Sequence, residues 1–249
     1  MSVSLEALFA QALERVEILR ATQSGAIRNA AELLAGRLRM GGVVHIFGTG
    51  HSVAFAMELA GRAGGLVPMN IIALTDVCSR GGRPWSLLAD PALERDPQWA
   101  HELLALHHIE PADAFIVVSN SGRNGSTVEM ALEAKRRGLP LVIVTSLAHS
   151  REVTSRHPSG LRLFEIGDVV IDNCGPYGDA LLGDPRLAGS VCSVSSITGG
   201  FIAQSLTAEI TRLMLEQGEA PPVLISANVD GADEHNQRVR QGYGNRISW

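Results

Sequence analysis

The chain has 249 residues, of which 45% are apolar and only 4% aromatic, and its formal net charge is −5. This length fits one large α/β domain, and the charge argues against general binding to nucleic acid or to an anionic membrane. No apolar run reaches the roughly 18 residues that span a bilayer, and residues 1–20 lack the apolar core of a signal peptide, so we expect a cytoplasmic protein.

Apolar residues at three-to-four spacing predict a long N-terminal helix from Leu5 to Leu38, with Gly25 as a candidate break. The rest of the chain alternates short apolar runs with amphipathic helices. We expect strands at residues 43–47, 67–74, 114–118, 141–145 and 169–171. We expect helices at 52–64, 98–107, 126–137 and 197–216, loops at 78–97 and 172–193, and an irregular tail from residue 221.

Strands that alternate with helices in this way predict an α/β three-layer sandwich, in which helices cover both faces of a parallel sheet. Right-handed crossovers place every strand-to-helix turn at the carboxyl edge of such a sheet, where ligands bind. We divide the chain into an N-terminal helical segment (1–40), the α/β domain (41–220) and a C-terminal tail (221–249) that is a candidate cover for the site.

A glycine-rich loop, residues 48–52, follows the first expected strand and opens a helix. Glycine lets the backbone approach a ligand, and the free N–H groups at a helix start favour an anion. The dinucleotide-binding pattern requires a third glycine where this chain has Val53, so that pattern is broken. An ordinary tight turn is the alternative to a phosphate site formed by Gly48, Gly50 and Ser52.

The turn after the third expected strand is unusually polar, since residues 119–127 read Ser-Asn-Ser-Gly-Arg-Asn-Gly-Ser-Thr. Its four hydroxyls can each donate to a phosphate, and each charge-assisted hydrogen bond contributes roughly 1.5–3 kcal/mol. The alternative is a polar loop in which Ser126 caps the helix, but two such loops at one sheet edge favour a phosphate site. We expect contacts from Ser119, Asn120, Ser121, Gly122, Asn124, Ser126 and Thr127.

The order strand, Ser-x-Ser-Gly, helix, Gly-Leu-Pro, strand resembles the SIS (sugar isomerase) domain over residues 33–217. The resemblance implies a five-stranded parallel sheet of flavodoxin-like topology, with a phosphosugar held between the two loops. Ser119, Ser121 and Gly122 match the family's phosphate loop, whereas Asn124 stands where the family usually has Ser or Thr. Residues 172–180 and 227–236 also resemble motifs of a bacterial SIS subfamily.

Glu58, His51 and His235 are the acid/base candidates. Glu58 lies in Glu-Leu-Ala-Gly-Arg, which is similar to the segment that carries the acid/base glutamate of heptose isomerases. A carboxylate and a histidine can open a sugar ring and move a proton between neighbouring carbons near neutral pH. The alternatives are a solvated helix charge for Glu58, a helix-start contact for His51 and a solvated tail for His235.

Metal and redox chemistry find little support in the sequence. The three cysteines are far apart, and Asp230, Asp233 and His235 lack a diagnostic metal spacing, so we expect no metal and no cofactor.

The sequence favours an aldose–ketose sugar-phosphate isomerase. An amino-sugar-phosphate etherase or lyase remains open because Ser121-Gly122-Arg123 resembles the etherase loop, and so does a non-enzymatic phosphosugar-sensing module. The roughly 40 residues before the first strand are too few for the DNA-binding domain of the family's transcriptional regulators. The apolar first and last helices favour a homodimer or homotetramer, which a monomer by light scattering would refute.

Overall fold

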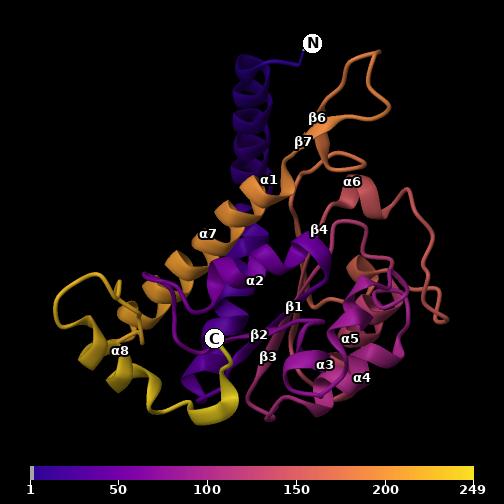
Figure 1. Cartoon of the computed structure of the whole chain (residues 1–249). Helices are drawn as coiled ribbons and strands as arrows, with labels where there is room; N and C mark the ends of the chain where they lie inside the picture. The colour runs from indigo at the N-terminus through magenta and orange to yellow at the C-terminus, as the bar shows by residue number, and fades with distance from the viewer. Residues whose placement is uncertain (1–2) are drawn as a thin grey trace.

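Two layers of helices enclose a parallel sheet in the computed structural model, which describes residues 3–249 (Figure 1). Residues 1 and 2 of the predicted N-terminal segment lie outside the described residues. The five strands lie in the order β2-β1-β3-β4-β5, which confirms the predicted α/β sandwich of flavodoxin-like topology. They are β1 (Val44–Gly48), β2 (Met69–Ile72), β3 (Ala114–Val118), β4 (Leu141–Thr145) and β5 (Val169–Asp172).

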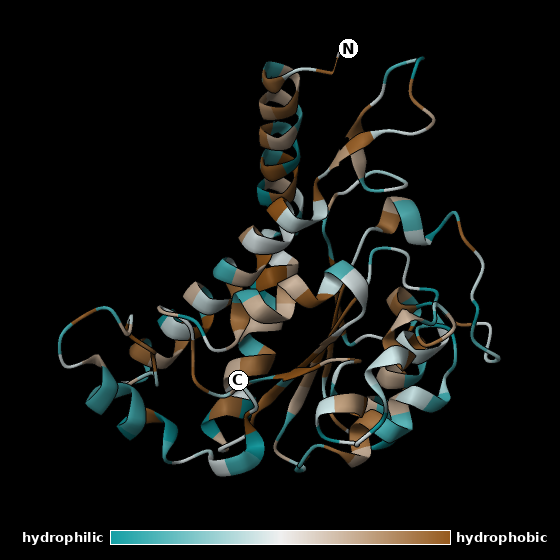
Figure 2. Ribbon diagram, viewed as in Figure 1, coloured by the Kyte–Doolittle hydropathy of each residue, from teal (hydrophilic) through white to brown (hydrophobic). Residues whose placement is uncertain are grey.

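The helices divide between the two faces of the sheet. One face carries α1 (Leu5–Arg39), α2 (Val53–Leu59) and α7 (Ser195–Glu216); the other carries α3 (Asp76–Ser79), α4 (Gln98–Ala105) and α5 (Gly125–Arg136). Alternate side chains of β3 serve the two layers, since Ile116 packs toward α1 and α7 and Val117 packs toward α4 and α5. The strands are therefore apolar on both faces, as Figure 2 shows by their brown colour.

Several predicted elements differ from the structure. Gly25 does not interrupt α1, because packing of the helix against α7 and β5 outweighs the roughly 1 kcal/mol cost of one glycine. Several short elements were not predicted. The segments predicted as loops or irregular tail contain the hairpin strands β6 (Ala180–Leu182) and β7 (Val191–Ser193), α8 (Ala232–Arg240), and 3-10 turns at Gly50–Ser52, Trp85–Ala89 and Gly244–Arg246. Residues 146–168, for which no element was predicted, contain α6 (Leu147–Ser150) and a 3-10 turn at Leu163–Glu165.

The C-terminal tail packs at the amino edge of the sheet. Ile247 joins a small apolar cluster with Val43 and Val67, the residues that come just before β1 and β2. The indole Nε1 of Trp249 donates to the carbonyl oxygen of Met69 (2.6 Å). Within one chain the tail therefore lies at the amino edge and does not cover the carboxyl edge, so it remains a candidate cover only for the site of a neighbouring copy. None of the helices in residues 3–249 is both long and apolar enough to cross a membrane.

A buried polar network lies beneath this tail. The Asp113 carboxylate accepts hydrogen bonds from the amides of Val43 (2.7 Å) and Glu110 (2.7 Å) and from Nε2 of His45 (3.0 Å). Nδ1 of His45 accepts from the Asn70 amide (3.0 Å), so the imidazole is neutral. Burial lowers the pKa of His45 below its ordinary value, although the nearby Asp113 carboxylate acts in the opposite direction.

Acidification below about pH 6.5 is expected to destabilise the fold through His45. Because the pKa of His45 is lower in the folded chain than in the unfolded chain, the unfolded chain binds the extra proton, and the free energy of unfolding falls as the pH drops. One such group contributes a slope of at most about 1.4 kcal/mol per pH unit. Urea unfolding between pH 7 and 5 should show this slope; His45→Gln should flatten it, and the exposed His108→Gln should not.

Candidate functional site

The two predicted loops begin side by side. Gly48, the last residue of β1, is the register partner of Val118, the last residue of β3. The strand order reverses between these two strands, and in open α/β sheets ligands bind at the carboxyl edge next to that reversal. The fold thus brings the two loops together at the position where a ligand site is expected.

A cavity of about 230 Å³ opens at this edge, between α2 and α7. His51, Ser52 and Glu58 line it from the first loop and α2, and Asn120 lines it from the second loop. The structure therefore brings together two of the three predicted acid/base residues and two of the predicted phosphate contacts.

Glu58 is held at the rim of this cavity. One carboxylate oxygen, Oε1, accepts a hydrogen bond from Gln204 Nε2 (2.7 Å) and forms an ion pair with Arg62. The side chain keeps 32% of its surface exposed, and no hydrogen bond within residues 3–249 engages Oε2. Glu58 is thus oriented by two neighbours while one oxygen is available to a ligand.

Three lining residues with polar side chains were missed by the sequence analysis: Asn173, Ser195 and Ser196. Asn173 is the residue directly after β5. Its side-chain Nδ2 donates a hydrogen bond to Oδ1 of Asn120 (2.6 Å), which fixes the orientation of both side chains. Ser195 begins α7, where its amide and hydroxyl donate to the Asp179 carboxylate (2.9 and 2.7 Å). The paired serines before an apolar helical stripe were the available signal for this helix start.

The first half of the second loop forms a tight turn. The Gly122 amide donates to the Ser119 hydroxyl (3.2 Å), and Gly122 has a φ of +57°. A Cβ at Gly122 would lie 3.3 Å from Cβ of Leu163, so the turn requires glycine. Ser121 beside it is half-buried. Ser119, Ser121 and Gly122 shape the turn that presents Asn120 and do not themselves line the cavity.

The second half of this loop is occupied by the chain itself. The Ser126 amide and hydroxyl both donate to the carbonyl oxygen of Glu94 (3.2 and 2.8 Å), and Thr127 is fully buried. The side-chain Nδ2 of Asn124 donates to Oε2 of Glu94 (3.1 Å). The segment before α4 therefore covers the start of α5, which no local sequence pattern indicates. Asn124 instead lines a second cavity on the other side of the first loop, together with Gly48 and Gly50.

His235 lies elsewhere in the chain. Its Nε2–H donates to the carbonyl oxygen of Val223 (2.9 Å), and its Nδ1 accepts from Arg238 (3.2 Å). Both contacts belong to the tail at the amino edge, so His235 does not line the cavity of its own chain. It can reach such a cavity only in a neighbouring copy.

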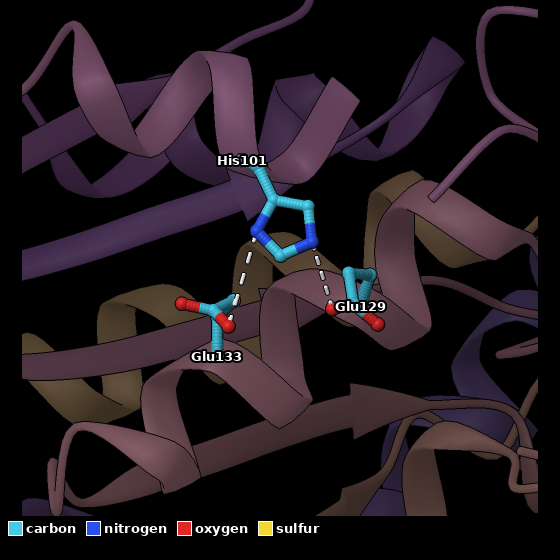
Figure 3. Close-up of side chains that lie close together, drawn as sticks. All are labelled: His101, Glu129 and Glu133. Carbon is cyan, nitrogen blue, oxygen red and sulfur yellow. Dashed lines mark ion pairs between the residues drawn. The ribbon is translucent and has the colours of Figure 1, made fainter. Parts of the chain in front are cut away.

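A histidine–carboxylate cluster lies on the outer helices. His101 on α4 and Glu129 and Glu133 on α5 place one ligand atom each within 4.8 Å of one another (Figure 3). Arg136 forms ion pairs with both glutamates, and His157 lies 2.7 Å from Glu129. Both carboxylates are thus already paired with Arg136, and none of these residues lines either cavity.

The family of the chain follows from its relatives. A model of the SIS domain matches residues 8–146, more than half of the chain. The chain belongs to the SIS-domain family. A UPF0309 protein from Caldanaerobacter subterraneus is 38% identical over 94% of this SIS protein and 95% of its own length. A UPF0309 protein from Listeria monocytogenes is 39% identical over 96% of this SIS protein and 97% of its own length. It is thereby a UPF0309 protein.

Solved structures confirm the resemblance at the level of the fold. The phosphoheptose isomerase GmhA from Neisseria gonorrhoeae superposes with a TM-score of 0.55 at 19% identity, over 84% of this SIS protein and 97% of that chain. A phosphoheptose isomerase from Francisella tularensis gives 0.54 at 18% identity, over 84% and 96% of the two chains. At such identities the likeness describes the backbone architecture alone.

Proposed function

We propose that this SIS protein binds a sugar phosphate in the first cavity and interconverts its aldose and ketose forms. One observation carries the proposal: Glu58 and His51, both able to transfer protons, share a cavity with the hydrogen-bonding side chains of Ser52 and Asn120. The cavity lies at the carboxyl edge beside the strand reversal, where ligands of open α/β sheets bind.

The reaction requires only proton movements. A base removes the proton from the hydroxyl-bearing carbon next to the carbonyl and returns it to the former carbonyl carbon, while a second group moves the proton of that hydroxyl to the former carbonyl oxygen. We assign the first task to Glu58, whose carboxylate is oriented at the cavity by Arg62 and Gln204. We assign the second task to His51, which is exposed on the same cavity.

Phosphate recognition is assigned to the loops at the cavity floor. Ser52 and Asn120 offer a hydroxyl and a carboxamide, and Ser196 adds a hydroxyl at the start of α7. Neutral donors suit an anion that must be bound without a general positive potential, because the chain carries a net charge of −5.

A panel of hexose and heptose phosphates, together with an amino-sugar phosphate that carries a carboxylic acid in ether linkage, tests the proposal by thermal shift and by turnover. Aldose–ketose conversion is the expected result. Release of a carboxylic acid from an amino-sugar phosphate would instead identify an etherase, and binding without turnover would identify a sensor. If no sugar phosphate raises the melting temperature, the proposed ligand class is wrong.

We also propose that the protein is a homodimer or homotetramer. The first turns of α1 project beyond the body of the molecule (Figure 1) and expose Leu5, Phe9 and Leu13 by 64%, 59% and 62%, at a spacing that forms one stripe. Light scattering should show an oligomer for the natural chain and a smaller species when the three residues are replaced by glutamate. A monomeric natural chain contradicts this proposal.

A further inference from the structure

Two carboxamides that line the first cavity form a hydrogen-bonded chain with a fixed direction. The chain begins at a group that can only donate, because the backbone N–H of Gly175 donates to Oδ1 of Asn173 (2.9 Å). Since Oδ1 of Asn173 is the acceptor, its Nδ2 is the group that donates to Oδ1 of Asn120 (2.6 Å). One backbone N–H therefore sets the orientation of both amides.

Asn173 cannot easily reverse this direction. The residue is only 3% exposed, and its backbone N–H donates to the carbonyl oxygen of Thr145 (2.8 Å). A rotation of its amide by half a turn would place Nδ2 against the N–H of Gly175 and Oδ1 against Oδ1 of Asn120. Both hydrogen bonds would then be lost in a region with little access to water, which makes the rotation unfavourable.

Asn120 consequently turns its donors toward the cavity. Its backbone is held in place, because its carbonyl oxygen accepts from Oγ1 of Thr145 (3.1 Å) and from the amide of Ser146 (3.3 Å). Its Oδ1 already accepts from Asn173, whereas no hydrogen bond within residues 3–249 engages its Nδ2. The two N–H bonds of Nδ2 are thus the part of this amide that a ligand can use.

Two other lining groups have the opposite polarity. The Ser195 hydroxyl donates its single proton to Oδ2 of Asp179 (2.7 Å), which leaves the lone pairs of Oγ for a ligand. Nε2 of Gln204 donates to Oε1 of Glu58 (2.7 Å), and Oε2 remains an acceptor. The cavity therefore offers donors at the ends of β3 and β5 and acceptors at Ser195 and Glu58.

We propose that Asn173 is a positioning residue that fixes the polarity of the first cavity. Through Asn120 it selects a ligand group that accepts hydrogen bonds and cannot donate them, such as an ionised phosphate. Ser195 and Glu58 accept from the hydroxyl groups of the same molecule. The inference rests on the proposed function, since it takes the ligand to be a sugar phosphate, and it commits to one orientation with the phosphate at Asn120.

Asn173→Asp tests this role, because it replaces the one donor of the chain by an acceptor. The aspartate can still accept from the N–H of Gly175, but it cannot donate to Asn120. The Asn120 amide is expected to rotate and donate from Nδ2 to the new carboxylate, so that Oδ1 faces the ligand. Isothermal titration calorimetry with fructose 6-phosphate should then show an affinity at least about tenfold lower than that of the natural chain.

A double-mutant cycle separates this effect from the added negative charge. Asn120→Ala removes the amide and should by itself lower the affinity for fructose 6-phosphate about tenfold. In that background Asn173→Asp should change the affinity by less than about threefold, because no amide is left to reverse. An equal loss in both backgrounds would overturn the proposal. Asn228→Asp adds the same charge at an exposed residue that lines neither cavity, and this matched control should bind as the natural chain does.

NMR of the side-chain amides in the natural chain without ligand needs neither a variant nor a sugar phosphate, so it decides the direction even if Asn173→Asp fails to fold. The Nδ2 protons of Asn173 are expected to exchange slowly with solvent and those of Asn120 quickly. The reverse pattern would show that Asn173 does not set the polarity. If the expected pattern appears but millimolar fructose 6-phosphate does not bind, the positioning role stands, and the ligand class of the proposed function is wrong.

Discussion

Glu58→Gln is expected to lower turnover of the sugar phosphate by about 10²- to 10⁴-fold while its KM changes little. Glutamine preserves the shape of the side chain and can still contact Gln204 and line the cavity, but it cannot accept the substrate proton. Steady-state kinetics on the substrate identified from the panel measure both parameters. A lost base should appear in kcat, because the ground-state contacts of the sugar phosphate remain.

Glu209→Gln provides the matched control, since Glu209 lies on α7, forms an exposed ion pair with Arg212 and does not line the cavity. It should leave kcat and KM unchanged. If Glu58→Gln retains turnover within a few-fold of the natural chain, Glu58 is not the base. His51→Asn is then the next variant to measure by the same kinetics.

Asp113→Ala is expected to lower the free energy of unfolding by about 3–5 kcal/mol. The carboxylate is fully buried, accepts from two backbone amides and from His45, and forms an ion pair with Arg246 of the tail. Alanine would leave these donors without an acceptor in a region closed to water. Urea denaturation followed by circular dichroism measures the loss.

The control for this prediction is Glu17→Ala, which removes one partner of an exposed ion pair with Arg20 and should have a much smaller effect. Loss of the Arg246 contact should also loosen the tail, which the fluorescence of Trp249 can report. A decrease below 1 kcal/mol for Asp113→Ala would show that water or a rearranged tail replaces the missing acceptor.

Local patterns predicted most of the sheet because its strands are short apolar runs between turn residues. The run 114–118 became β3 and the run 141–145 became β4 without a change in bounds. The polar turns after β1 and β3 were equally visible, since hydroxyls and glycines directly after a buried strand serve no apolar core. The pairing of Gly48 with Val118 then followed from the parallel order of the sheet.

The composition of the cavity was less predictable, because it depends on segments that are distant in sequence. Asn173 enters the site only because β5 ends beside β4, and Ser126 leaves it because the carbonyl oxygen of Glu94 accepts both its hydrogen bonds. The tail shows the same limit: its anchors Arg246 and Trp249 act through Asp113 and Met69, more than 100 residues earlier in the chain.

The sequence alone determined the alternation of strands and helices, the parallel sheet and the two polar turns, because each depends on the periodicity and turn chemistry of neighbouring residues. Only the tertiary structure decided that Glu58 and His51 share one cavity, that His235 lies at the opposite edge of its own chain and that Asn124 lines a second cavity. The physical reason is that side-chain proximity across elements depends on helix packing angles and loop paths, which no local pattern encodes.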